Sequence, residues 1–184
     1  CCLTRKIHIV LRIDLYLLHW LGSHPLADTV EGFERLRDAG HIRHWGVSNF
    51  NTDDMQELWQ LATGPKGVAN QVYYSASRRG IEFDLLPWQR ARGVAAMAYC
   101  PIDQGTLAND QGLSLIAKRH GPIAVQVALA WVLRRPDVIA IPKAAREVHL
   151  RKNLDAARIE LSTSDLEAID RLFSPPRGKQ PLAM

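Results

Sequence analysis

Five short apolar runs, separated by longer segments with helical spacing, constrain the fold of this chain more than any other feature. The runs cover residues 14–20, 44–47, 69–74, 94–99 and 138–141, and turn or polar residues bound each of them. Their length and boundaries predict β-strands. Strands that are apolar on both faces and alternate with helices are typical of a parallel sheet covered by helices, so the pattern predicts an α/β fold.

Capping signals indicate where the intervening helices begin and end. Helices are predicted over residues 26–39, from residue 51 or 52 to about 61, over 121–135 and over 162–173. Gly40 supplies a left-handed cap at the end of the first. Gly121 and Pro122 are expected to open the third. Ser162 and Asp165, three residues apart, resemble a capping box that opens the last.

Two parallel α/β architectures fit these elements. A (β/α)8 TIM barrel takes about 250 residues and rarely fewer than about 200, so five strand–helix units in 184 residues fit an incomplete barrel. An open doubly wound sheet is the alternative. The dinucleotide-binding form of that sheet carries a G-x-G-x-x-G motif, and its absence from the sequence favours the barrel.

Composition excludes several classes of protein. With 47% hydrophobic and 23% charged residues, the chain has the composition of one soluble globular domain. Its longest apolar stretch, residues 123–132, is interrupted by Gln126 and is shorter than the roughly 20 residues of a membrane span. The net charge of +4 comes from scattered lysines and arginines, so no nucleic-acid partner is expected. Cys1, Cys2 and Cys100 form neither a disulfide framework nor a zinc pattern, and a cytoplasmic location is expected.

Several longer motifs resemble the aldo/keto reductase family. They are Ile-Asp-Leu-Tyr-Leu-Leu-His-Trp at 13–20, Gly-His-Ile-Arg-His-Trp-Gly-Val-Ser-Asn-Phe at 40–50, Asn-Gln-Val at 70–72, Ala-Tyr-Cys-Pro at 98–101 with Gln-Gly at 104–105, residues 124–133, Ile-Pro-Lys at 141–143, Asn153 and residues 161–170. In order, they correspond to strands four to eight of the family's eight-stranded barrel. The resemblance implies that residues 1–184 form a single, N-terminally truncated NADP-dependent oxidoreductase domain without strands one to three.

Residues 1–12 depart from the family pattern. They do not resemble the amphipathic helix that normally leads into the first matched strand. We interpret them as an atypical leader produced by a truncated or frame-shifted reading, with a divergent N-terminus as the alternative.

The resemblance implies a catalytic or nicotinamide-binding role for residues that end the predicted strands. His19 lies at the C-terminal end of its strand, the end where barrel active sites form. It would orient the substrate carbonyl and stabilise the charge that develops on its oxygen. Ser48, Asn49 and Gln71 would hold the nicotinamide carboxamide, which needs both donors and acceptors. Tyr99 would stack on the nicotinamide ring.

Residues further along the chain would hold the rest of the cofactor. The pyrophosphate contacts would come from the backbone around Ile102, Gln104, Gly105 and Leu107, and from Cys100, which stands where the family usually has Ser. Lys143 resembles the cation that pairs with the adenosine 2′-phosphate, and Arg146 adds a second positive group. Asn153 matches the adenine contact, while His149 stands where many members have Arg. These residues favour NADPH over NADH.

The resemblance therefore implies hydride transfer from NADPH to a small aldehyde or ketone. In the family the unmatched strands supply the catalytic Asp, Tyr and Lys. None of Tyr16, Tyr73 and Tyr74 is followed by a matching Lys–Asp arrangement, and we assign none of them as the acid. Losing general acid catalysis costs on the order of 10² to 10⁴ in rate.

Two other functions remain open. The chain is alternatively an inactive NADPH-binding fragment, or a pseudoenzyme or binding module like the redox-sensing channel β-subunits that share this fold. A basic interaction protein unrelated to nicotinamide would have to match Ser48, Asn49, Gln71 and Lys143 by chance. A monomer is expected, although unpaired strand edges offer a route to association.

Overall fold

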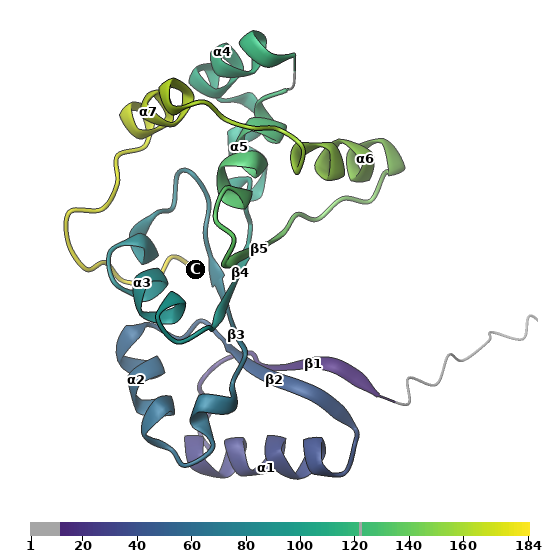
Figure 1. The fold of residues 1–184 in the computed structure, drawn as a ribbon, viewed down its shortest axis with the longest axis vertical. Helices are drawn as coiled ribbons and strands as arrows, with labels where there is room; N and C mark the ends of the chain where they lie inside the picture. The colour runs from purple at the N-terminus through teal and green to yellow at the C-terminus, as the bar shows by residue number, and fades with distance from the viewer. Residues whose placement is uncertain (1–11, 122) are drawn as a thin grey trace, which may run out of the picture.

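The computed structural model describes residues 12–121 and 123–184, which contain a parallel sheet (Figure 1). Its strands are β1 (Ile13–Leu18), β2 (Ile42–Ser48), β3 (Ala69–Tyr73), β4 (Ala95–Tyr99) and β5 (Val138–Ile141). They lie in the sheet in chain order, and each pairs in parallel with the next. A doubly wound sheet changes strand order at a switch point, so sequential order excludes that alternative and supports a barrel-like sheet.

The connecting helices lie on one side of this sheet. The α-helices are α1 (Leu26–Asp38), α2 (Thr52–Gln60), α3 (Leu85–Arg90), α4 (Gln111–His120), α5 (Ala124–Leu133), α6 (Glu147–Ala156) and α7 (Thr163–Leu172), and the 3-10 helices are η1 (Gly64–Lys66), η2 (Gly80–Glu82) and η3 (Asp103–Asn109). In Figure 1, α1, α2 and α3 lie below and to the left of the strands, and no described helix covers the right-hand side of β1 to β4. Barrels carry their helices in this one-sided way.

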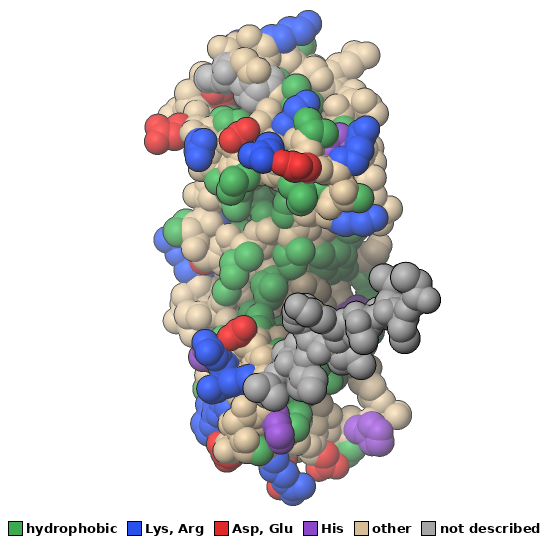
Figure 2. Space-filling view, turned by 90° about the vertical axis from the view of Figure 1, so that its right-hand side faces the viewer, with side chains coloured by type: hydrophobic (Ala, Val, Ile, Leu, Met, Phe, Trp, Pro, Cys, Tyr) green, Lys and Arg blue, Asp and Glu red, His purple; other side chains and the backbone are tan. Residues whose placement is uncertain are grey.

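The hydrophobic core lies between the sheet and these helices. Trp45 of β2 is fully buried, and its ring centroid lies 5.7 Å from that of Phe33 in α1. On β5, Val138 is buried, whereas Ile139 and Ile141 are 51% and 37% exposed. Figure 2 shows hydrophobic side chains gathered along the middle of the face turned toward the viewer. One face of the sheet therefore packs in the core and the other exposes apolar groups.

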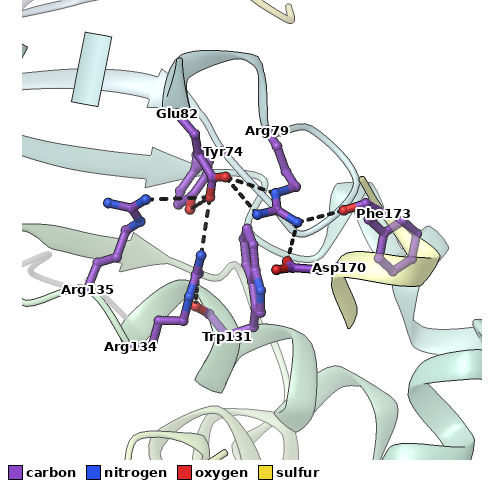
Figure 3. A network of polar contacts seen from close by, with 8 residues as sticks. All are labelled: Tyr74, Arg79, Glu82, Trp131, Arg134, Arg135, Asp170 and Phe173. Atoms are coloured by element: carbon purple, nitrogen blue, oxygen red, sulfur yellow. Dashed lines mark hydrogen bonds and ion pairs between the residues drawn. The ribbon is translucent and has the colours of Figure 1, made fainter. Parts of the chain in front are cut away.

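A network of charged and aromatic side chains joins η2 to α5 and α7 (Figure 3). Its members are Tyr74, Arg79, Glu82, Trp131, Arg134, Arg135, Asp170 and Phe173. The buried Glu82 carboxylate accepts hydrogen bonds from Arg79 at 2.8 Å and Arg134 at 3.2 Å. Arg79 also donates to Asp170 at 2.7 Å. Each buried charge has an opposite partner, and the network links α7 to η2 and α5.

The five predicted strands are confirmed, with small shifts at their ends. The capping box at Ser162 is confirmed as well, because Ser162 Oγ accepts from the Asp165 backbone N–H at 3.2 Å and the Asp165 carboxylate accepts from the Ser162 backbone N–H at 3.1 Å. Gly40, with a φ of 78°, follows α1 as predicted. The residue 1–12 leader falls outside the described part of the chain, except for residue 12.

The predicted start of the third helix is wrong. Gly121 has a φ of 81° and is the left-handed C-cap of α4, and α5 begins only at Ala124. Glycine adopts that conformation without a steric penalty, so it ends one helix here instead of opening the next. Pro122 lies outside the described residues.

No helix in the described part of the chain has both the length and the hydropathy needed to cross a bilayer.

Candidate functional site

Polar groups at the ends of β1, β2 and β4 meet at the carboxyl-terminal edge of the sheet, around Asn49. The Asn49 amide nitrogen donates to Ser48 Oγ at 3.0 Å and to the His19 carbonyl oxygen at 3.3 Å. Its amide oxygen accepts from the Tyr99 hydroxyl at 2.9 Å. Asn49 has a φ of 59°, a left-handed conformation that asparagine tolerates better than most residues. The structure thus brings His19 and Tyr99 to the adjacent pair Ser48 and Asn49, 30 and 50 residues from Asn49 in the sequence.

Gln71 joins this group from β3. It pairs with Ser48 in the register of β2 and β3, and its carbonyl oxygen accepts from Ser48 Oγ at 3.1 Å and from the Asn49 N–H at 2.8 Å. The Gln71 side chain is half-buried, and its amide has no hydrogen-bond partner among the described residues. The edge therefore presents an amide that is available to a ligand.

His19 and Tyr99 flank this edge. His19 directly follows β1, is exposed, and packs its ring against Trp20 with centroids 5.2 Å apart. Burial, with a smaller contribution from Cys100, raises the pKa of Tyr99. The Tyr99 hydroxyl therefore remains protonated and serves as a donor to Asn49.

The two tyrosines of β3 and its end are each bonded to a carboxylate. Tyr73 donates to Asp103 Oδ1 at 2.5 Å, and Tyr74 donates to Glu82. Burial raises the pKa of both hydroxyls well above the usual range, and the neighbouring carboxylates raise it further. Both hydroxyls therefore keep their protons and donate hydrogen bonds to carboxylates within the protein.

The loop after β4 has an unusual backbone. Cys100, Asp103 and Gln104 have positive φ values of 50°, 49° and 55°, and Gly105 has one of 97°. Leu107 is 2% exposed and packs in the core, so only its backbone is available to a ligand. The loop thus carries the residues predicted to contact the pyrophosphate, in a conformation that few non-glycine residues adopt.

A pocket of about 290 Å³ lies beyond this loop. Its lining residues are Ile102, Ala108, Ile123, Val125, Lys143, Ala144, His149, Lys152 and Asn153. Four of them, Ile102, Lys143, His149 and Asn153, were predicted to bind the cofactor. Arg146 does not line the pocket and instead contacts His149 Nε2 at 2.8 Å. The combination of apolar walls and positive side chains suits a flat ring that carries a phosphate.

Sequence reasoning missed several residues of the site. The apolar wall at Ala108, Ile123 and Val125 comes from two segments whose approach leaves no trace in the local sequence. A second pocket, of about 370 Å³, is lined by Tyr73, Arg78, Asp103, Gln104, Thr106, Ala183 and Met184. Of these residues only Gln104 was predicted to bind the cofactor.

The chain is similar to proteins of known family. Its sequence matches the aldo/keto reductase family over residues 5–173. It is 45% identical over 177 residues to methylglyoxal reductase YeaE of Escherichia coli (strain K12), covering 94% of this chain and 62% of that protein. It is 36% identical over 165 residues to glyoxal reductase of Bacillus subtilis (strain 168), covering 90% and 58%.

A solved structure indicates the same family. The crystal structure of an aldo-keto reductase from Klebsiella pneumoniae in complex with NADPH matches with a TM-score of 0.92 and 45% identity, covering 95% of this chain and 63% of that one. The chain thus spans less than two thirds of the length of the relatives and structure named here. The parallel sheet with one-sided helices is that of a TIM-barrel-like fold. By sequence and by fold, the chain belongs to the aldo/keto reductase family.

Proposed function

We propose that this protein reduces small aldehydes or ketones with hydride from NADPH, and that this chain holds the cofactor. The observation that carries the proposal is the pocket of about 290 Å³, in which Lys143, His149 and Asn153 meet beside an apolar wall. An adenine ring needs the wall, and a 2′-phosphate needs the cation. The NADPH complex of the Klebsiella pneumoniae relative supports the same cofactor.

The nicotinamide end would lie at the edge of the sheet. Gln71 offers an amide without a described partner, and Asn49 and Ser48 lie beside it. The Tyr99 ring borders the same edge and would stack on the nicotinamide. The loop of residues 100–107, with Cys100, Ile102, Gln104, Gly105 and Leu107, would span the distance between the two ends of the cofactor. Arg146, which contacts His149 outside the pocket, would reach the 2′-phosphate less directly than Lys143.

His19 would act on the substrate. Its carbonyl oxygen accepts a hydrogen bond from Asn49, which places the His19 backbone beside the proposed nicotinamide position. A neutral imidazole there would orient the carbonyl oxygen and stabilise the charge that forms when the bound NADPH delivers hydride to carbon.

We further propose that residues 1–184 are one domain and that β1 to β5 correspond to strands four to eight of a (β/α)8 barrel. The sequential order of the strands and the one-sided helices support this assignment. The share of the relatives that the chain spans, 62% for the Escherichia coli protein, also fits five of eight units. The catalytic Asp, Tyr and Lys would then lie on strands outside this sheet.

An inactive NADPH-binding protein is the second candidate. The observation in its favour is that Tyr73 and Tyr74 are both bonded to carboxylates and raised in pKa. These two hydroxyls would then be poor proton donors to a substrate, as expected of a protein that binds NADPH without reducing a carbonyl.

Calorimetric titration with NADPH and, separately, NADH tests the proposal. We expect dissociation constants on the order of micromolar for NADPH and weaker binding of NADH. If neither nucleotide binds, the proposed cofactor site is wrong. If NADPH binds, its consumption in the presence of methylglyoxal, measured on a protein that also carries the proposed catalytic Asp, Tyr and Lys, separates a reductase from an inactive binder.

A further inference from the structure

The loop after β4 is held in an unfavourable backbone conformation. Three non-glycine residues in it, Cys100, Asp103 and Gln104, have left-handed φ values. Such conformations cost free energy and persist only where surrounding contacts hold them. Contacts from outside the loop must therefore fix its shape.

Asp103 supplies those contacts, because both oxygens of its carboxylate are engaged. The Tyr73 hydroxyl donates to Oδ1 at 2.5 Å, and Ser77 Oγ donates to Oδ2 at 2.9 Å. The Arg78 guanidinium lies 3.7 Å from Oδ1. The Asp103 side chain is only 12% exposed, and hydrogen bonds to a shielded carboxylate are among the stronger ones.

Contacts at the end of β3 and in the following turn hold the two hydroxyl donors in place. Tyr73 is the last residue of β3, and the fully buried Ser75 forms a bridge with Arg78 in the turn that follows. Ser75 Oγ lies 3.1 Å from Ser77 Oγ, which orients the second donor. The Tyr73 ring also packs against Tyr99, with centroids 5.2 Å apart. The same tyrosine thus contacts both the loop and the proposed nicotinamide platform.

We propose that Tyr73 and Ser77 are positioning residues that clamp the loop of residues 100–107, through Asp103, in the shape that receives the cofactor diphosphate. This inference rests on the proposed function. The loop begins at Tyr99 in the nicotinamide half and contributes Ile102 to the pocket of the adenosine half, so its shape sets how the two halves are joined. A loop that is already ordered avoids the entropy loss of being ordered by the ligand.

The clamp also reduces the repulsion between the Asp103 carboxylate and the cofactor diphosphate. An Asp103 carboxylate turned toward the diphosphate would repel it. Because two hydroxyl donors and Arg78 hold that carboxylate, its charge is partly neutralised within the protein.

The test compares two ligands on the same variant. NADPH spans both halves of the site, whereas adenosine 2′,5′-bisphosphate engages only the adenosine pocket. Tyr73→Phe keeps the ring beside Tyr99 and removes the hydroxyl. We expect the dissociation constant of NADPH to rise about tenfold, the worth of a hydrogen bond to a charged group, while that of adenosine 2′,5′-bisphosphate, whose pocket takes only Ile102 from the loop, rises much less.

Two more variants complete the experiment. Ser77→Ala removes the second donor and is expected to show the same selective loss, which keeps the inference testable if Tyr73→Phe fails to fold. Tyr74→Phe is the matched control, because Tyr74 is also buried and bonded to a carboxylate, Glu82, but belongs to the network of Figure 3. In Tyr74→Phe, the affinities for NADPH and for adenosine 2′,5′-bisphosphate should both fall or both stay unchanged.

The outcomes separate the inference from the function on which it rests. If the unaltered chain binds neither ligand, the cofactor site itself is wrong and the clamp falls with it. If the unaltered chain binds both, and Tyr73→Phe and Ser77→Ala bind NADPH as tightly as it does or lose both ligands equally, the clamp alone is overturned.

Discussion

We predict that the choice between NADPH and NADH depends on Lys143. It lines the pocket of about 290 Å³ and is exposed. Because NADPH differs from NADH by the 2′-phosphate, Lys143→Met should weaken NADPH binding about tenfold and leave NADH binding unchanged. Calorimetry at low and high salt measures this, and the loss should shrink at high salt because the ion pair is screened.

Lys118→Met is the control for that experiment, because Lys118 is an exposed lysine of α4 that does not line the pocket. Equal losses in both variants, or equal losses for both cofactors, would contradict the assignment of Lys143. Lys143 and Asn153 were predicted from family motifs and His149 from its position between them, and all three line one pocket. Asp103 was not predicted from the sequence, because its proposed role depends on a hydrogen bond with Tyr73, which is 30 residues away in the chain.

At the scale of elements, Glu34 links α1 to β2 and η1. Its carboxylate accepts hydrogen bonds from Trp45 of β2 at 2.8 Å, from Lys66 of η1 at 2.6 Å and from Arg37 at 2.7 Å. Burial alone would raise the pKa of Glu34, but the hydrogen bonds from Lys66 and Trp45 and the charge of Arg37 lower it below 4.5 overall. The native state thus favours the ionised form.

The stability that follows from this shift has a definite pH dependence. A carboxyl group whose pKa is lower in the folded state stabilises the protein above its unfolded value, and the stabilisation is lost as pH falls through the folded pKa. Unfolding by urea at neutral pH and below pH 4.5 should show this loss, and Glu34→Gln should be less stable at neutral pH with a flatter pH dependence. Glu147→Gln alters a largely exposed pair with Arg151 and should change stability by less than about 1 kcal/mol. A variant Glu34→Gln with an unchanged pH profile would refute the role of this carboxylate.

The elements that the sequence predicted differ in character from those that it did not. The strands were predicted because each is a short apolar run with clear boundaries, and α7 because its capping box is local. By contrast, α6 escaped prediction because Val148, Leu150 and Leu154 are all more than half exposed, so the helix has no buried stripe to produce a periodic pattern. α3 spans only Leu85–Arg90, which is too short for a helical period to emerge.

At the scale of the whole molecule, the sheet has two unpaired edges and an uncovered face. Among the described strands, β1 pairs only with β2, and β5 pairs only with β4. A closed barrel has no such edges, whereas open ones pair readily with other chains. The parallel order of the strands was predictable from their apolar character, but the exposure of this face was not, because it depends on which strands lie opposite.

Ile139 offers a test of what this geometry does in solution. It is 51% exposed on the edge strand β5, and burying such a side chain between two chains is favourable by roughly 1.5–3 kcal/mol. We therefore expect the chain to associate as its concentration rises, and Ile139→Lys to raise the concentration required by about tenfold or more. Sedimentation velocity over a concentration series measures both effects.

Leu115→Lys is the control, since Leu115 is 64% exposed but lies on α4, away from the sheet edges. A chain that stays monomeric throughout, or one whose association both variants weaken equally, would show that the open edge at β5 is not the site of association.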